Sequence, residues 1–272
     1  MSRLSAKNLK IAYGETEIIR DLSVEIPDGK ITSIIGPNGC GKSTLLKTLS
    51  RILFPHNGAV YLDGKEIAKE ATKKIAQKMA ILPQSPDAPE GLTVAELVSY
   101  GRYPYQKGFG KLKADDWKAI DWALQVTGVD AFRNRPIDAL SGGQRQRVWI
   151  AMALAQETDI ILLDEPTTYL DLSHQLEVLE LLQYLNRVEH RTIVMVIHDL
   201  NQAARFAHHI VAMKDGEIQK QGSADDVMTC EVLRNVFNID AEIVTDPRTR
   251  KPVCLCYDLV ASYNNAADKI AQ

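Results

Sequence analysis

The sequence GPNGCGKS occupies residues 36–43, where it follows a short apolar run and precedes a segment of helical character. It fits the pattern G-x-x-x-x-G-K-[ST] in the strand-to-helix context that the pattern requires, and so predicts a phosphate-binding loop. Glycines in such a loop let backbone N–H groups turn inward around phosphate oxygens. We expect Lys42 to reach the β- and γ-phosphates of ATP and Ser43 to ligate Mg²⁺. The other loop residues expected to line the nucleotide are Gly36, Pro37, Asn38, Gly39, Cys40, Gly41 and Thr44.

A second part of the same site is expected at DIILLDEP, residues 159–166. A buried strand there delivers Asp164 and Glu165 to its carboxyl end, which is where α/β sheets bind ligands. Asp164 suits a contact to Mg²⁺, and Glu165 is placed to orient or deprotonate a water for attack on the γ-phosphate. The alternative for Glu165 is a carboxylate that stabilises the start of the next helix.

Strand-like and helix-like runs alternate around these motifs without a tandem repeat, which favours an α/β fold. Residues 31–35 are apolar and suit a buried parallel strand. The pairs Asp63-Gly64 and Asp215-Gly216 predict hairpin turns. Further strands are expected within residues 9–15, 17–26, 79–84, 159–166, 192–200 and 241–257, and helices within 44–53, 93–156 (interrupted at 101–111), 172–188 and 223–237.

Composition narrows the class of protein. The chain has 272 residues with 45% hydrophobic side chains, which is enough for a substantial core. A net charge of −3 without a long basic run gives no support for nucleic-acid binding. No apolar run reaches the roughly 18 residues of a membrane span, and the amino terminus lacks the apolar region of a signal peptide. We therefore expect a soluble chain that docks on a membrane protein.

The four cysteines show no metal-binding spacing, and we expect packed, reduced thiols. A strand through Cys254 and Cys256 would point both side chains to one face. Cys40 lies inside the phosphate loop, where proximity to a helix start favours a lowered thiol pKa and higher reactivity.

LSGGQRQR, residues 140–147, leads into the apolar run VWIAMALAQ and has the character of a second helix start. The first N–H groups of a helix lack intrahelical partners, so such a start favours an anion. The chain thus carries two anion-seeking helix starts but the motifs of one nucleotide site.

LSGGQRQR, taken with the two motifs above, resembles the signature of the ATP-binding-cassette (ABC) ATPase family. Other family motifs follow in order. Tyr13 resembles the aromatic residue that stacks on adenine, Gln84 the Q-loop glutamine that contacts Mg²⁺ and senses the transporter, Asp171 the D-loop, and His198 the switch histidine that contacts the γ-phosphate. The alternatives are surface packing for Tyr13, a strand cap for Gln84 and a core histidine for His198. His174, His208 and His209 have no such context and are interpreted as surface or packing residues.

The resemblance answers the question of the second helix start. It implies a head-to-tail homodimer in which Ser141, Gly142, Gly143 and Gln144 of one subunit cover the ATP held by Lys42 of the other. It implies that Lys42, Glu165 and His198 are catalytic, and that Gln84, besides Ser43 and Asp164, contacts Mg²⁺. The domain prediction is a P-loop ATPase domain over 1–222 with an N-terminal antiparallel β subdomain, a helical subdomain inserted at 91–156, and a C-terminal appendage over 223–272.

Residues 168–186, 198–218 and 244–253 are similar to the branch of importers for ferric siderophores, haem and cobalamin, and most similar to the siderophore ATPases. That likeness implies separate permease subunits docking near Gln84 and 97–106, an indirect link to a substrate-binding protein, and a place at the cytoplasmic face of the inner membrane. A plain helix-ending loop is the alternative for 97–106.

Other functions remain as alternatives: a haem or cobalamin importer, a soluble non-transport ABC ATPase, or a P-loop kinase or GTPase. The last class does not explain LSGGQ, and a GTPase would need a guanine motif that is absent. Arg250 departs from the family, which often has Gly there, and this puts the turn of the tail in doubt.

Overall fold

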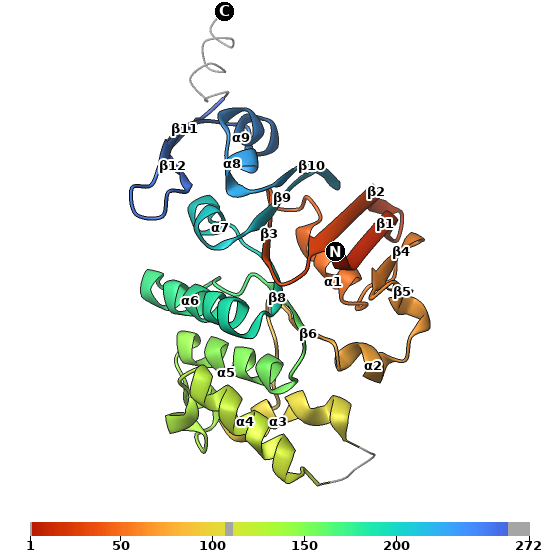
Figure 1. Ribbon diagram of the computed structural model, residues 1–272, viewed down its shortest axis with the longest axis vertical. Helices are drawn as coiled ribbons and strands as arrows, with labels where there is room; N and C mark the ends of the chain where they lie inside the picture. The colour runs from red at the N-terminus through yellow and green to blue at the C-terminus, as the bar shows by residue number, and fades with distance from the viewer. Residues whose placement is uncertain (1, 107–110, 261–272) are drawn as a thin grey trace, which may run out of the picture.

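The computed structural model describes residues 2–106 and 111–260. The predicted interruption at 101–111 therefore lies partly outside the described residues. Figure 1 shows two sheets side by side at mid-height, a group of helices below them and a small C-terminal unit above. The fold is the α/β fold that the sequence predicts.

The first sheet is antiparallel, with the order β2-β1-β4-β5. Its strands are β1 (Ser2–Tyr13), β2 (Thr16–Pro27), β4 (Asn57–Leu62) and β5 (Lys65–Glu66). The turn between β4 and β5 falls at Asp63 and Gly64, as predicted. Apolar side chains alternate with polar ones along β2, which gives the sheet one face to bury.

The second sheet carries the site, in the order β10-β9-β3-β8-β7-β6. Its strands are β3 (Ile31–Ile35), β6 (Met79–Leu82), β7 (Ile160–Asp164), β8 (Thr192–Val196), β9 (His209–Lys214) and β10 (Glu217–Gly222). All neighbouring pairs are parallel except β9 and β10. Every residue of β3, β7 and β8 is buried, as expected for central strands covered on both faces.

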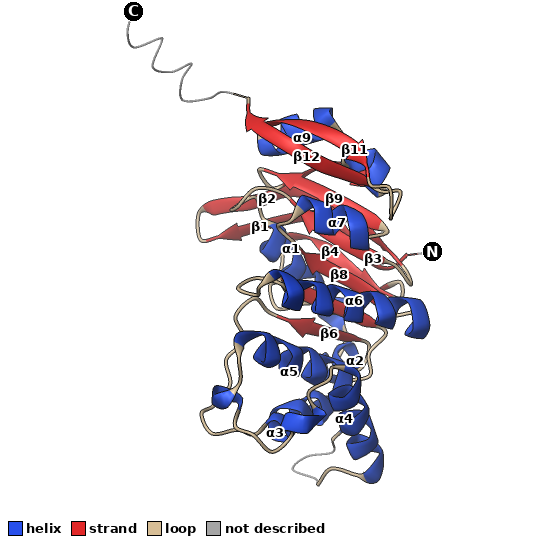
Figure 2. Cartoon of the chain, turned by 90° about the vertical axis from the view of Figure 1, so that its left-hand side faces the viewer, coloured by secondary structure: helices blue, strands red, loops and turns tan. Residues whose placement is uncertain are grey.

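Helices cover the second sheet on both faces (Figures 1 and 2). Helix α1 (Lys42–Leu49) packs on one face, and α6 (Leu172–Glu189) and α7 (Leu200–Phe206) pack on the other. The remaining helices of the described residues are α2 (Thr72–Ala76), α3 (Val94–Ser99), α4 (Ala114–Val126), α5 (Gly142–Ala155), α8 (Ala224–Val227) and α9 (Cys230–Phe237), with short 3-10 turns η1 (Ile67–Lys69), η2 (Tyr100–Tyr105), η3 (Asp130–Phe132) and η4 (Ile137–Ala139). The predicted helix over 44–53 ends earlier, because Arg51 takes a left-handed backbone and Ile52 and Leu53 both donate to the Lys47 carbonyl.

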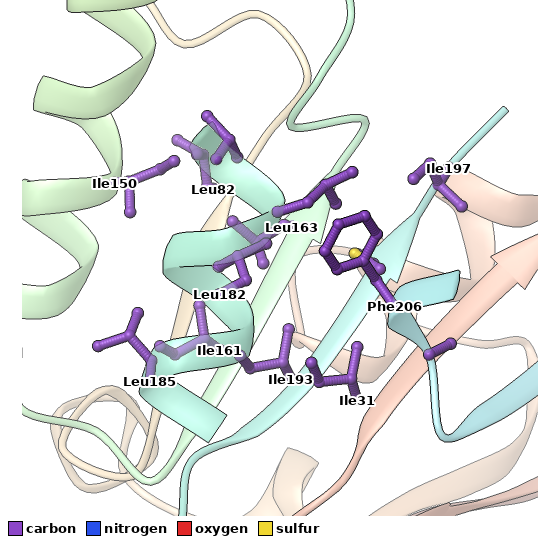
Figure 3. Close-up of a cluster of buried hydrophobic side chains, with 14 of the residues drawn as sticks. Ile31, Leu82, Ile150, Ile161, Leu163, Leu182, Leu185, Ile193, Ile197 and Phe206 are labelled. Carbon is purple, nitrogen blue, oxygen red and sulfur yellow. The ribbon is translucent and has the colours of Figure 1, made fainter. Parts of the chain in front are cut away.

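Two apolar clusters hold the layers together, and the central strands contribute alternately to each. Figure 3 shows the first cluster, in which Ile150 of α5, Leu182 of α6 and Phe206 of α7 pack with side chains of the sheet. The second cluster joins α1 to the antiparallel sheet. The second cluster thus supports the phosphate loop and α1 on one face of the sheet. The first cluster supports α5, the helix that follows LSGGQ, on the other face.

Helices α3, α4 and α5 lie together at the end of the molecule away from the C-terminal unit (Figure 2). Arg102 ties η2 to this group and is only 4% exposed. Its guanidinium donates to Asp116 of α4 at 3.0 Å and to the carbonyl of Ala155, at the end of α5, at 2.7 Å. The ring of Tyr105 stacks below it at 4.1 Å. The helices fall inside the predicted 91–156 insertion, and the domain boundaries stay a prediction.

The C-terminal unit corrects one expectation. The single helix predicted over 223–237 is wrong: Ser223 caps α8 as expected, but Thr229 caps a second helix, α9, by accepting from the N–H of Val232. The hairpin of β11 (Ile239–Thr245) and β12 (Pro252–Leu259) follows, which confirms the two strands predicted within 241–257.

The turn of this hairpin, which contains Arg250, is held by hydrogen bonds to Asp246. Asp246 accepts from the Thr249 hydroxyl and from the N–H groups of Arg248 and Arg250. Arg250 has φ 59°, the left-handed region that glycine adopts most easily. The arginine therefore occupies a glycine-like conformation.

The thiols are only partly packed. Cys254 is buried, whereas Cys256 is exposed, because a β-bulge interrupts the register of β12 between them. Cys230 is exposed as well, so the expectation of uniformly packed thiols is wrong for these two residues.

Candidate functional site

The phosphate loop joins β3 to α1, as the sequence pattern predicts. Gly36 has φ 153°, and a Cβ atom there would lie 2.2 Å from the carbonyl oxygen of Met213, so only glycine fits. Gly41 is the N-cap residue of α1 and has φ 101°. The turn between β9 and β10 holds the loop from outside, because the Gly216 N–H donates to the Cys40 carbonyl at 3.1 Å. The loop backbone is therefore fixed by its neighbours.

Lys42 is buried and points back into this loop. Its Nζ donates to the carbonyl oxygens of Gly36 at 2.9 Å and Pro37 at 2.8 Å. A lysine held across the loop in this way presents its ammonium charge at the loop's concave side, where the phosphates of a nucleotide would lie.

Ser43 and Asp164 connect the two parts of the predicted site across 121 residues of sequence. The Ser43 hydroxyl donates to Asp164 Oδ1 at 2.8 Å. Asp164 is 2% exposed, and burial raises the pKa of its carboxyl group against the opposing pull of the Ser43 hydrogen bond. The strand end thus delivers a carboxylate to the first turn of α1.

Glu165 is the centre of the site and follows β7 with φ 53°, a left-handed backbone for a side chain with a Cβ atom. Its Oε1 lies 2.7 Å from His198 Nε2, and its Oε2 accepts from Gln84 at 2.6 Å. Thr168 donates a third hydrogen bond at 3.0 Å. Burial alone would raise the pKa of Glu165, but these hydrogen bonds and the charge of His198 outweigh it and lower the pKa. The carboxylate is therefore ionised near neutral pH, as a proton acceptor must be.

Thr168 was not expected in this role. It lies three residues after Glu165, in the turn before α6, and its carboxylate contact is local. A threonine three residues after a predicted catalytic carboxylate therefore indicates, from sequence alone, a hydroxyl that can donate to that carboxylate.

Tyr13 lies on the hairpin that touches the phosphate loop. It ends β1 opposite Thr16, and a Cβ atom at Gly41 would lie 3.3 Å from Ile18 at the start of β2. The Tyr13 side chain is half-exposed. An aromatic face is therefore available beside the loop, which suits a purine.

The LSGGQ segment begins α5, as predicted. Ser141 Oγ accepts from the Gln144 N–H at 3.3 Å, and Gln144 Oε1 accepts from the Ser141 N–H at 3.1 Å. This reciprocal pair is a capping box. Figures 1 and 2 both place α5 apart from α1. One chain thus holds its two anion-seeking helix starts in different parts of the molecule.

Asp171 is the exposed N-cap residue of α6, and its side chain is held by several local hydrogen bonds. It accepts from the His174 N–H at 2.9 Å and from the Ser173 hydroxyl at 2.9 Å, and its Oδ1 lies 2.7 Å from His174 Nδ1. The His174 N–H, then the Ser173 hydroxyl and the His174 ring, lower the pKa of Asp171 to about 2. His174, interpreted from the sequence as surface or packing, is thus bound to a predicted site residue. The spacing of three residues from a helix cap is the signal that was missed.

His208, which is exposed, and His209, which is half-buried, match their interpretation as surface or packing residues. His208 Nδ1 accepts from the Ile31 N–H at 3.1 Å, and burial lowers the pKa of both imidazoles. Neither residue lines the site.

Cys40 differs from the expectation of a reactive thiol. Its side chain is 5% exposed, and burial raises its pKa, with Lys42 opposing the shift. The prediction of a lowered pKa is wrong, because burial of the thiol raises its pKa by more than the charge of Lys42 and the backbone N–H groups at the helix start lower it.

We expect iodoacetamide to alkylate Cys40 about tenfold more slowly than the exposed Cys230, because the thiolate is the reactive form and Cys40 is both buried and less acidic than a free thiol. Peptide mass spectrometry of the native chain measures both rates, and denaturation in urea is the control that should equalise them. Equal native rates would contradict the burial described above.

The segment 97–106 presents two exposed rings, Tyr100 and Tyr103, while Gly101, Arg102 and Pro104 are buried. The predicted docking surface and its alternative, a plain helix-ending loop, both accommodate exposed rings here. Within 2–106 and 111–260, no helix has both the length and the apolar character needed to cross a bilayer.

Known proteins resemble this chain along most of its length. The family model for ABC transporters matches residues 19–168. The chain is 64% identical over 260 residues to the iron(3+)-hydroxamate import ATP-binding protein FhuC of Bacillus subtilis (strain 168), covering 96% of this chain and 97% of that protein. It is 47% identical to the ferric enterobactin transport ATP-binding protein FepC of Escherichia coli (strain K12), covering 93% of each.

Solved structures agree. An ABC transporter in an inward-facing conformation matches with a TM-score of 0.81 and 30% identity, covering 94% of this chain and 98% of that chain. The cassette MJ0796, solved as a dimer bound to ADP and Pi, matches with a TM-score of 0.72 and 32% identity, covering 81% of this chain and 98% of that one. The site geometry and these matches together place the chain in the ABC transporter family, as one of its ATPases.

Proposed function

We propose that this chain is the ATP-hydrolysing subunit of a binding-protein-dependent importer of ferric siderophores. The observation that carries the ATPase assignment is Glu165, an ionised carboxylate held between His198 and Gln84 beside the Ser43–Asp164 pair. The cargo rests on relatives: a ferric-hydroxamate and a ferric-enterobactin ATP-binding protein both match nearly the whole chain. The proposed cargo therefore depends on likeness, whereas the proposed chemistry depends on geometry.

The proposed reaction is attack of water on the γ-phosphorus of ATP. The water oxygen bonds to phosphorus as the bond to the β–γ bridging oxygen breaks, which gives ADP and inorganic phosphate. Glu165 takes the proton of the attacking water, and Lys42 offsets charge on the phosphates. His198 contacts the γ-phosphate and keeps Glu165 oriented through the 2.7 Å contact.

The residues present suit Mg²⁺. This ion prefers oxygen ligands and is held in nucleotide sites by one or two protein groups plus phosphate oxygens. Ser43 Oγ and the Asp164 carboxylate meet at 2.8 Å, and Gln84 donates to Glu165, the residue that follows Asp164. We propose that these three residues hold the ion, which would neutralise negative charge on the β- and γ-phosphates.

The proposed active unit is a homodimer, with Ser141, Gly142, Gly143 and Gln144 of one copy against the ATP of the other. The separation of α1 from α5 supports this arrangement, because one copy cannot present both helix starts to one triphosphate. Closure on ATP would satisfy the phosphate charge from two sides, and release of phosphate would reopen the dimer. Tyr13 would stack on adenine, and Asp171 would contact the partner copy.

The proposed membrane partner docks near Gln84 and residues 97–106. Gln84 donates a hydrogen bond to Glu165, and the rings of Tyr100 and Tyr103, further along the chain, are exposed. A permease at this surface would place the chain at the cytoplasmic face of the inner membrane, with a substrate-binding protein on the other side.

The test begins with purification of the tagged chain from its native membrane. We expect a permease to co-purify, and the reconstituted complex to hydrolyse ATP faster when its binding protein carries a ferric siderophore. Tyr103→Ser should release the permease, whereas Phe54→Ser, a change of an exposed ring outside the docking segment, should not. Stimulation by haem or cobalamin instead would overturn the cargo assignment, and full activity without any permease would overturn the transport role.

A further inference from the structure

The first turn of α6 touches segments that serve different parts of the proposed reaction. Its cap is Asp171, and its residues His174 and Gln175 reach out in different directions. None of these contacts is needed to cover the apolar core, because His174 and Gln175 are only half-buried. The contacts of His174 and Gln175 therefore do more than pack α6 against the core.

His174 joins Asp171 to the start of α5. Its Nδ1 lies 2.7 Å from Asp171 Oδ1. Its ring fills the space beside Gly143, where an added Cβ atom would lie 2.6 Å from His174 Cδ2 and 2.9 Å from Cγ. The imidazole therefore lies against the LSGGQ backbone, and residue 143 must lack a side chain for it to do so.

The ring contact is not required for capping. Asp171 already accepts from the backbone N–H of His174 at 2.9 Å and from the Ser173 hydroxyl, which satisfies the cap. Nor is it the sole link between α5 and α6, since Arg147 pairs with Glu177 at 3.2 Å. Removing the imidazole should therefore leave both helices in place while freeing the local position of Gly143 relative to Asp171.

Gln175 extends the connection toward His198. Its Nε2 donates to the Leu170 carbonyl at 3.0 Å, and its Oε1 accepts from Gln202 at 2.7 Å. Gln202 is 7% exposed, and its backbone N–H donates to Asp199, the neighbour of His198, at 2.8 Å. A continuous set of hydrogen bonds thus runs from the segment before α6 to the start of α7.

We propose that His174 is a positioning residue that fixes the LSGGQ start relative to Asp171, so that both meet the partner copy's ATP in one geometry. Gln175 and Gln202 tie the same turn to the segment that carries His198. This inference rests on the proposed ATP hydrolysis across a homodimer. His174 itself has no contact with the nucleotide in this scheme and acts through Gly143 and Asp171.

The test measures steady-state hydrolysis and ATP affinity of the full-length chain. We expect His174→Ala to lower kcat about tenfold, since small displacements of positioned groups carry large rate penalties, while ATP binding to the dilute chain is unchanged. His174→Asn keeps a donor for Asp171, and His174→Phe keeps a ring at Gly143. Each should retain a higher kcat than His174→Ala. Glu180→Ala, an exposed position on the same helix, is the matched control and should behave as wild type.

A double-mutant cycle sharpens the result. If His174 acts through Asp171, the kcat loss of His174→Ala should shrink in an Asp171→Asn background, because coupled residues are not additive. Full additivity would overturn the coupling.

The proposal is overturned if His174→Ala keeps the wild-type kcat, or if kcat and ATP affinity fall together in all three variants. Its failure differs from failure of the proposed function: in the latter case the wild-type chain would not hydrolyse ATP or Glu165→Gln would remain active. An active wild type, an inactive Glu165→Gln and an unaffected His174→Ala would reject the positioning role alone.

Discussion

Glu165→Gln should bind ATP and form a stable dimer while its hydrolysis rate falls about a thousandfold, the range expected for loss of a general base. Glutamine keeps the shape and still accepts hydrogen bonds from Gln84 and Thr168, so the site remains assembled. It cannot take a proton from water, so ATP persists at the dimer interface. Phosphate release and sedimentation velocity in MgATP measure the two effects.

The control for Glu165→Gln is Glu25→Gln, which removes the charge of an exposed carboxylate on β2. It should leave both hydrolysis and the monomer–dimer balance unchanged. A Glu165→Gln chain that sediments as a monomer in MgATP, or that still turns over at the wild-type rate, would remove Glu165 from its proposed role.

Ser141→Arg should abolish turnover, with a loss of more than about a hundredfold, because a missing electrostatic contact to the reacting phosphate carries that penalty. The bulky side chain would occupy the space of the partner copy's γ-phosphate. ATP binding to the dilute chain should be nearly intact, because Lys42 and the phosphate loop lie elsewhere in the same copy. Fluorescent-nucleotide titration and phosphate release separate the two.

Two controls frame the Ser141→Arg result. Ser141→Ala removes the cap of α5, at a stability penalty of about 1 kcal/mol, without adding bulk, and so separates capping from obstruction. Lys42→Ala should lose ATP binding itself. If Ser141→Arg weakens binding as much as Lys42→Ala does, the two helix starts serve the same ATP molecule and the trans arrangement is wrong.

Sequence predicted the parts of this protein that depend on local pattern. The phosphate loop requires glycines at fixed spacing, and β3 and β7 are recognisable because central strands are apolar throughout. The second helix cap in the tail was not predicted, because threonine in mid-segment looks the same whether it caps a helix or continues one.

The rest could not be predicted because it depends on tertiary neighbours. The pKa of Glu165 is set by its burial, which raises it, and by hydrogen bonds that lower it, two of them from His198 and Gln84, which lie far away in sequence. The pKa of Cys40 is raised by burial of its thiol. The contact of His174 with Gly143 depends on how α5 and α6 cross. The proposed residue roles thus rest on the order of the motifs, whereas pKa directions and side-chain contacts required the fold.

The buried guanidinium of Arg102 bears on how such a protein can change partners during evolution. Its Nε and Nη1 groups donate to Asp116, the Ala155 carbonyl and Glu157, and the residue is only 4% exposed, so it holds the helical group together from within. The neighbouring rings of Tyr100 and Tyr103 are exposed to solvent instead. Under the proposed docking, substitutions at those two positions would change which membrane subunit is recognised, while the arginine preserves the packing of the helices beneath them.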